Sequence, residues 1–154
     1  MTFPPVPVDV AFTRLLADSY RHFHRAPLLP ADLAGPAAAE WIYTDAPFCI
    51  LVHDTSPDPQ YIYVNRAAQR CFEYSWDEFI GMPSRLSAEL PNRQERQEFM
   101  AAVLRAGYVD NYRGLRVAKS GRRFWIEDAT VWNVIDARGV LHGQAALIRR
   151  RTDA

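Results

Sequence analysis

The chain has 154 residues, of which 49% are hydrophobic, and its 18 basic and 18 acidic side chains give a formal net charge of zero. This length fits one domain. The balanced charge argues against the basic surface that nucleic-acid binding needs. The two cysteines, Cys49 and Cys71, form neither a disulfide framework nor a metal-binding motif, so we expect reduced thiols and a cytoplasmic location.

Neither a targeting segment nor a membrane segment is expected. Residues 1–10 contain three prolines and one acidic residue, and they lack the basic start and the apolar core of a signal peptide. No stretch of about 18 apolar residues offers a membrane span.

Helices are predicted at the start of the chain. From residue 8 to residue 25, apolar side chains recur at helical spacing, which indicates an amphipathic helix. Its apolar face would consist of Phe12, Leu15, Leu16, Tyr20 and Phe23. A second short helix is predicted over residues 37–43, before Pro47. Both belong to an N-terminal helical extension, residues 1–46, which we expect to pack on a sheet or to lie in a dimer interface.

After Pro47 the pattern changes to strand. Residues 48–53 and 61–64 are apolar runs on either side of a turn-rich segment, and two such runs predict a hairpin.

Further helices follow the hairpin. Asn65 and Ser75 are each placed to cap a short helix, and Asn92 is placed to open a longer one that Gly107 ends. Glu95 stands three residues after Asn92, where it would complete a capping box.

The C-terminal third is β-structure again. Residues 108–119, 122–134 and 140–148 predict an antiparallel meander, in which Ser120 and Gly121 form the first turn. The element order predicts an α+β fold: a five-stranded antiparallel sheet with short helices over one face and N-terminal flanking helices.

Sequence motifs carry a family resemblance. The run YIYVNRAAQRCFEYSWDEFIG, residues 61–81, resembles the signature of PAS domains, and the chain is most similar to their MEKHLA branch, found as solo bacterial proteins and in plant homeodomain leucine-zipper transcription factors. The matching stretches within residues 47–147 are PFCILVHD, YIYVNRAAQ, GMPSRLSAE, NYRGLRVAKSGRRFWIEDATVWNV and HGQAA. The resemblance implies a PAS domain over residues 47–150.

The same resemblance implies a function. PAS domains serve as sensory, ligand-binding or protein-interaction modules, so we expect no catalysis here. We expect no attached output domain, and therefore signalling in trans through an unknown protein partner, without nucleic acid or membrane.

PAS domains of the LOV type bind flavin mononucleotide and attack it with the cysteine of a GxNCRFLQ motif. The comparable residues 81–88, GMPSRLSA, have Ser84 in place of that thiol, and Ile126 replaces an amide that reads the flavin edge. Gln144 comes about three residues too early to be the flavin-reading glutamine, which leaves Leu147 nearest that place. We therefore expect no flavin.

Haem and metals are not expected either. Haem-binding PAS domains usually ligate the iron with a histidine on the long helix, and residues 93–106 contain none. His53 and His142 lie on strands and no histidine pair has metal-ligand spacing. We expect a colourless protein with no cofactor.

Alternation along residues 123–134 assigns side chains to two faces of a strand. The predicted core face consists of Phe124, Ile126, Asp128, Thr130, Trp132 and Val134. The predicted outer face consists of Trp125, Glu127, Ala129 and Val131. A carboxylate inside the core needs a partner, because an unpaired buried charge is costly.

Two registers leave that partner open. A two-residue turn pairs Arg113 with Asp128, whereas a one-residue slip turns Tyr112 and Arg116 inward. The arginine near Asp128 would form either a structural salt bridge or, with Thr130, a polar anchor for a ligand.

Other polar residues complete the candidate ligand-binding set. Arg85 would hold an anionic group or instead bind a loop carbonyl or Glu89, and Asn65 would serve mainly as a cap. The full candidate set is Asn65, Ser84, Arg85, Tyr112, Arg113, Arg116, Asp128, Thr130, Trp132 and Gln144. The alternatives are a small enzyme using this polar cluster, for which no nucleophile and base pair can be named, and a protein-binding module with a filled core.

A homodimer is the expected assembly. Trp125, Ala129 and Val131 would form an apolar patch on the outer face of the sheet. The N-terminal helix would cover this patch in cis or meet its copy across a two-fold axis.

Overall fold

The computed structural model describes residues 5–154; residues 1–4, part of the segment used in the signal-peptide argument, lie outside the described residues. The helical elements are α1 (Val10–His24), α2 (Gly35–Glu40), the π-helix η1 (Trp41–Asp45), α3 (Arg66–Phe72), α4 (Trp76–Phe79), the 3-10 helix η2 (Ser84–Ser87) and α5 (Leu90–Ala106). The strands are β1 (Cys49–His53), β2 (Tyr61–Val64), β3 (Tyr108–Val117), β4 (Arg123–Ile135) and β5 (Leu141–Asp153).

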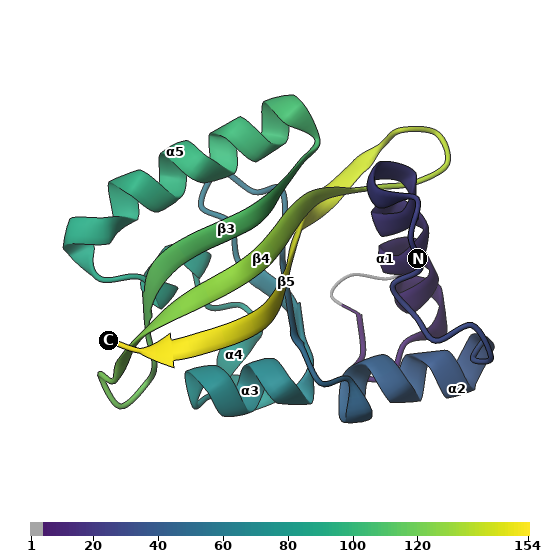
Figure 1. Ribbon diagram of the computed structural model, residues 1–154, viewed down its shortest axis with the longest axis horizontal. Coiled ribbons are helices and arrows are strands. Elements are labelled where there is room, and N and C mark those ends of the chain that lie inside the picture. The colour runs from purple at the N-terminus through teal and green to yellow at the C-terminus, as the bar shows by residue number, and fades with distance from the viewer. Residues whose placement is uncertain (1–4) are drawn as a thin grey trace.

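The strands form a single antiparallel sheet in the order β2-β1-β5-β4-β3 (Figure 1). This confirms the predicted α+β class, the β1–β2 hairpin and the C-terminal meander. The last strand is longer than predicted, since β5 extends to Asp153.

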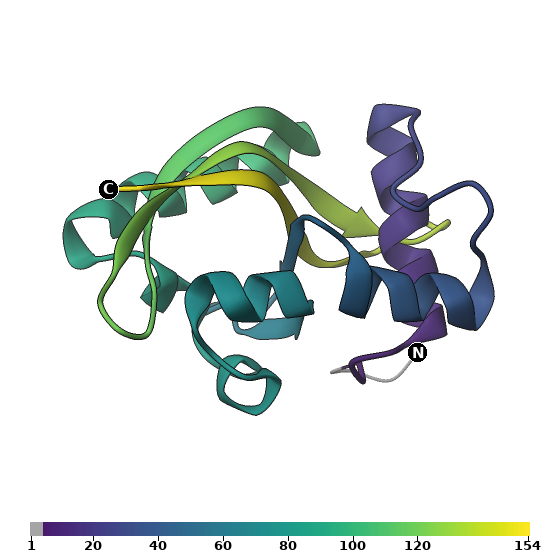
Figure 2. The same ribbon diagram turned by 60° about the horizontal axis from the view of Figure 1, so that its bottom comes forward.

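Two hydrophobic cores lie on opposite faces of this sheet. Side chains from α1 and η1 pack against one face of β1, β4 and β5. Side chains from α3, α4 and α5 pack against the other face, together with β3. In Figures 1 and 2, α1 and α2 lie at one end of the molecule, α3 and α4 lie toward its middle, and α5 extends along the other end.

Helix α1 covers the sheet within the same chain. Its apolar stripe packs on Trp132 of β4, and the indole Nε1 of Trp132 donates to the Ser19 hydroxyl at 3.0 Å. Arg149 of β5 donates to the Tyr20 hydroxyl at 3.1 Å and to the Thr130 hydroxyl at 2.9 Å. Large buried side chains contribute about 1.5–3 kcal/mol each, so this contact fixes α1 to the sheet.

The prediction for the two faces of β4 was wrong beyond residue 127. Asp128 has a φ of 50°, in the left-handed region, which interrupts the alternation of side chains. As a result Ala129, not Asp128, joins Phe124 and Ile126 in the core under α5. Trp132 instead belongs to the core under α1.

The β3–β4 register is the slipped one. Gly114 pairs with Ile126 and Arg116 pairs with Phe124, because residues 118–122 form a wider loop than the two-residue turn. Tyr112 and Arg116 are therefore buried.

Arg113, in turn, faces outward. It forms an ion pair with Glu127 at 3.5 Å, and its guanidinium lies 3.7 Å from the centre of the Trp125 ring. Neither Arg113 nor Arg116 forms an ion pair with Asp128, so the predicted Asp128 salt bridge is wrong.

Most predicted caps are confirmed. Asn65 caps α3, and Ser75 caps α4 in a capping box with Glu78. The cap at Asn92 was wrong, because α5 begins two residues earlier, at Leu90. Pro91 falls in the first turn, where its missing N–H has no helical acceptor to lose.

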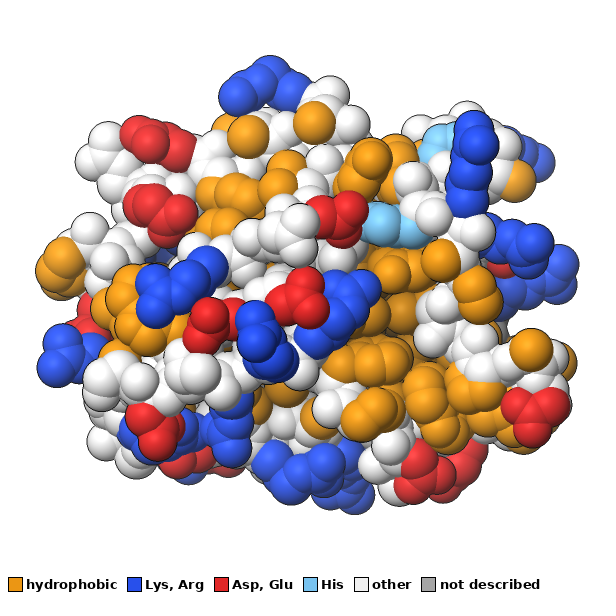
Figure 3. Space-filling model, viewed as in Figure 1, with side chains coloured by type: hydrophobic (Ala, Val, Ile, Leu, Met, Phe, Trp, Pro, Cys, Tyr) orange, Lys and Arg blue, Asp and Glu red, His pale blue; other side chains and the backbone are white. Residues whose placement is uncertain are grey.

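Arg, Lys, Asp and Glu side chains intermingle over β3, β4 and β5 on the face seen in Figure 3, and apolar side chains gather beside them, toward α1 and α2. Cys49 and Cys71 are free and buried. Within residues 5–154, no helix combines the length and the apolar character that crossing a membrane requires.

Candidate functional site

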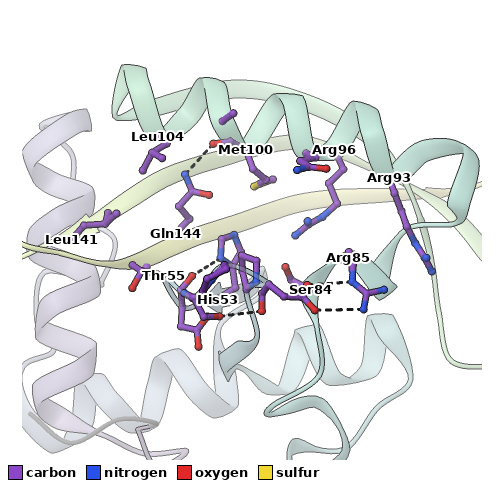
Figure 4. A pocket seen from close by; sticks show the side chains of 18 residues that line it. His53, Thr55, Ser84, Arg85, Arg93, Arg96, Met100, Leu104, Leu141 and Gln144 are labelled. Carbon is purple, nitrogen blue, oxygen red and sulfur yellow. Dashed lines mark hydrogen bonds and ion pairs between the residues drawn. The ribbon is translucent and has the colours of Figure 1, made fainter.

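A cavity of about 380 Å³ lies between α5, the β1–β2 loop and the start of β5 (Figure 4). Its volume is within the usual range for small-molecule sites. The lining residues are His53, Asp54, Thr55, Ser56, Pro57, Asp58, Pro59, Ser84, Arg85, Arg93, Arg96, Gln97, Met100, Ala101, Leu104, Leu141, Gly143 and Gln144. The cavity is thus built from four separate parts of the chain.

Helix α5 forms one wall. Arg96, Met100 and Leu104 are spaced four residues apart, so they lie on one face of the helix, and Figure 4 shows Arg96 and Met100 extending toward the cavity. The Arg96 side chain is only 8% exposed. An arginine is therefore held inside the molecule, between α5 and the sheet.

His53 forms the opposite wall, at the end of β1. It follows Cys49 and Leu51 on the same face of the strand, and its exposed fraction is 8%. Its Nδ1 bonds to the carbonyl oxygen of Asp54 at 3.0 Å, and its Nε2 is buried without a hydrogen-bond partner among the described residues.

Burial lowers the pKa of His53 to about 4, and the nearby Arg96 acts in the same direction. The Asp54 carbonyl and the Gln144 amide offset part of this decrease. Although Gln144 influences the pKa of His53, it does not complete a hydrogen bond to Nε2. The imidazole is consequently neutral at pH 7.

Ser84 and Arg85 reach the cavity from η2. The Ser84 hydroxyl is buried and has no hydrogen-bond partner among residues 5–154. Arg85 is half exposed at the rim and forms an ion pair with Asp58 at 3.2 Å, where the sequence analysis considered a loop carbonyl or Glu89. Its charge is therefore already compensated.

A second, smaller cavity of about 40 Å³ lies between α5 and the sheet. Tyr112, Arg116 and Ile126 line it, and Gln144 lines both cavities. Leu147, expected to stand nearest the flavin-reading position, lies in the core on the α1 side instead. The Gln144 amide donates to the carbonyl oxygen of Met100 and to Asn133, both at 3.1 Å.

The structure brings together only some of the candidate residues. Ser84, Arg85 and Gln144 line the large cavity, and Tyr112 and Arg116 line the small one. Five others line neither: Asn65, Arg113, Asp128, Thr130 and Trp132. The Asn65 side chain already bonds to four backbone groups.

Thr130 has its own partners on the α1 side. Its hydroxyl donates to Asp110 at 2.8 Å and accepts from Arg149, which also donates to the backbone carbonyl of Asp128. Thr130, which the sequence analysis placed in a polar cluster with Asp128, therefore takes part in the attachment of α1 through Arg149 and Tyr20.

Two residues of the site were missed by the sequence reasoning, His53 and Arg96. In each case the sequence pattern contained a sign that the residue is buried. His53 continues the alternation of Cys49 and Leu51, and Arg96 shares a helix face with Met100 and the fully buried Val103.

The residues do not fit the flavin chemistry of light-oxygen-voltage domains. Ser84 stands in place of the thiol of the GxNCRFLQ motif, and within residues 5–154 its hydroxyl forms no hydrogen bond that would activate it.

Solved structures support the fold. An RNA-binding light-oxygen-voltage receptor superposes with a TM-score of 0.64 at 24% identity, over 83% of this chain and 35% of that one. A PAS domain from Colwellia psychrerythraea gives 0.57 at 18% identity, over 73% and 90%. A light-oxygen-voltage domain studied with a flavin analogue gives 0.57 at 16% identity, over 70% and 77%. This chain thus spans about a third of the RNA-binding receptor.

A family assignment comes from the sequence as a whole. No curated protein matches the chain. The sequence model of the MEKHLA domain, however, matches residues 10–152, which include α1, α2, the first four strands and all but the last residue of β5. The chain belongs to the MEKHLA domain family and has the fold of PAS and light-oxygen-voltage domains.

Proposed function

We propose that this chain is a cytoplasmic, non-catalytic sensory module that binds a small molecule in the cavity under α5. One observation carries the proposal: polar groups of Ser84, His53 and Arg96 line the same cavity, and all three side chains are more than nine-tenths buried. Buried polar groups in folded proteins nearly always have partners. Here the Ser84 hydroxyl and His53 Nε2 have none within residues 5–154.

The same residues favour binding over catalysis. A general base works best when its pKa is near the working pH, and burial lowers the pKa of His53 to about 4. His53 is therefore a poor base at neutral pH, and no described residue forms a hydrogen bond that would activate Ser84.

Native mass spectrometry of the purified protein tests the proposal. We expect a bound small molecule, or added ligands that bind one per chain. Met100→Trp should fill the cavity and abolish binding, whereas Leu90→Trp, at an exposed position on the same helix, should bind like the wild type. Equal binding by the Met100→Trp variant would refute this cavity as the site.

We further propose that the chain acts in trans on a protein partner and forms a homodimer. Val6, Val8 and Val10 are all at least 40% exposed beside the start of α1, and apolar side chains gather near α1 and α2 in Figure 3. Light scattering after size exclusion should give the mass of two chains, and replacing the three valines by serine should give that of one. A wild-type monomer would contradict the dimer.

A further inference from the structure

Arg96 is a buried cation, and the described part of the chain gives it no acidic partner. No carboxylate among residues 5–154 forms an ion pair with it. Burial lowers its pKa, and the nearby Arg116 adds to this effect while the Tyr61 hydroxyl opposes it. An arginine nevertheless stays protonated in proteins. A buried charge of this kind is costly unless an anion compensates it.

Arg116, the other buried arginine, is compensated by the chain itself. Its Nη1 donates to the carbonyl oxygen of Leu115 at 2.8 Å, and its Nη2 donates to the Tyr112 hydroxyl at 3.1 Å. That hydroxyl donates in turn to Glu95 at 3.3 Å. The charge of Arg116 is thus linked to a carboxylate, and Arg96 is left as the buried arginine, among residues 5–154, that lines the large cavity.

His53 adds a hydrogen-bond acceptor to the same cavity. A carbonyl oxygen only accepts, so the 3.0 Å contact with Asp54 assigns the proton to Nδ1. Nε2 then has a lone pair and, at neutral pH, no proton. Figure 4 shows Arg96 and His53 extending into the cavity from opposite sides.

The remaining walls are partly apolar. Met100, Leu104 and Leu141 line the cavity beside the polar groups, and the Ser84 hydroxyl can either donate or accept. A complementary molecule has one anionic end, one N–H or O–H donor and an apolar body.

We propose that the cavity binds a small carboxylic acid, whose carboxylate pairs with Arg96 and whose N–H or O–H group donates to Nε2 of His53. This rests on the proposed function and adds the chemical class of the ligand. A single guanidinium matches a carboxylate in a two-pronged hydrogen bond. A phosphate monoester carries close to two charges near neutral pH. Of the other two arginines that line the cavity, Arg85 already pairs with Asp58, and Arg93 donates to the carbonyl oxygen of Ala88.

Calorimetric titration of the full chain tests the ligand class. The probes are benzoate, phenylacetate, mandelate and hexanoate, each with its primary amide, and phenyl phosphate. We expect at least one carboxylate to bind at least tenfold more tightly than its amide and than phenyl phosphate. Mandelate should bind more tightly than phenylacetate, because its hydroxyl can donate to His53.

Arg96→Gln should weaken carboxylate binding at least tenfold, whereas Arg105→Gln, exposed on the same helix, should leave it unchanged. Without ligand, Arg96→Gln should melt at the same or a higher temperature than the wild type, since it removes an unpaired buried charge. A purely structural arginine would give a lower melting temperature.

These experiments distinguish a failure of the carboxylate assignment from a failure of the proposed sensory function. Amides or phenyl phosphate that bind as tightly as the carboxylates, or binding unchanged in Arg96→Gln, would overturn the carboxylate assignment and leave the sensory proposal standing. If none of the probes binds and the purified protein releases no small molecule on heating, both proposals fail.

Discussion

Trp132 on β4 and Ser19 on α1 are joined by a buried hydrogen bond of 3.0 Å, across 113 residues of sequence. The bond satisfies the indole N–H inside the core between α1 and the sheet. It therefore makes the N-terminal helix part of the folded domain.

Replacing Ser19 by alanine should leave the Trp132 indole N–H buried and unpaired, which costs about 1–3 kcal/mol. The free energy of unfolding in urea measures the loss. Asp18→Ala, at the exposed neighbouring position, should change stability by less than about 0.5 kcal/mol. In a Trp132→Phe background, Ser19→Ala should cost clearly less, and an unchanged cost there would show that the bond is not the cause.

The left-handed backbone at Asp128 predicts how the stability of variants at this position should rank. Its φ of 50° is tolerated by Asn but strains a β-branched residue. We expect Asp128→Asn to stay within about 0.5 kcal/mol of the wild type and Asp128→Val to lose about 1–3 kcal/mol. A valine variant as stable as the asparagine variant would mean that the left-handed conformation is absent.

Gly143 of β5 packs against the backbone at the end of β1. A Cβ added there would lie 2.2 Å from the backbone oxygen of His53, a contact that only a shift of the strands can relieve. Gly143→Ala should therefore lose about 1–3 kcal/mol or more. Gly121→Ala, which has a positive φ but open space around it, should lose less. Equal urea midpoints for the two variants would contradict this account.

His53 should make stability depend on pH. The unfolded chain binds a proton at this residue below pH 6.5, but the folded chain does so only near pH 4. Stability therefore falls as the pH decreases between these values, by roughly 3 kcal/mol in total. His53→Gln should lack this part of the slope in urea titrations at several pH values. Parallel curves for the two proteins would show that the imidazole is not buried.

The order of helices and strands was predictable because the capping residues, the helix-ending glycine and the apolar strand runs all indicated the same fold. Asn65 and Ser75 marked helix starts, Gly107 marked a helix end, and the strand runs had the right spacing. The prediction of Asn92 as the cap was wrong because Pro91, the residue before it, is favoured in the first turn of a helix, so the helix begins before Asn92. Short-range chemistry was thus sufficient for the order of elements but not for every boundary.

The site was harder to predict because it depends on backbone geometry that side-chain patterns do not reveal. One left-handed residue, Asp128, reassigned the residues beyond it to the opposite face. The β3–β4 register depended on a loop whose length the Ser120-Gly121 pair did not specify. Arg96 was overlooked since a charged residue on a polar helix is ordinarily taken as solvated.

Strand β4 lies between two hydrophobic cores, and this position limits the substitutions that the strand can accept. Every residue from Ala129 to Val134 is buried, so this stretch has no solvent-facing side that could absorb a change in volume. A larger side chain must displace either α1 on one face or the core under α5 on the other. Natural variation within this family should consequently be lowest along these six positions and higher at Arg113 and Trp125, where the same sheet meets water.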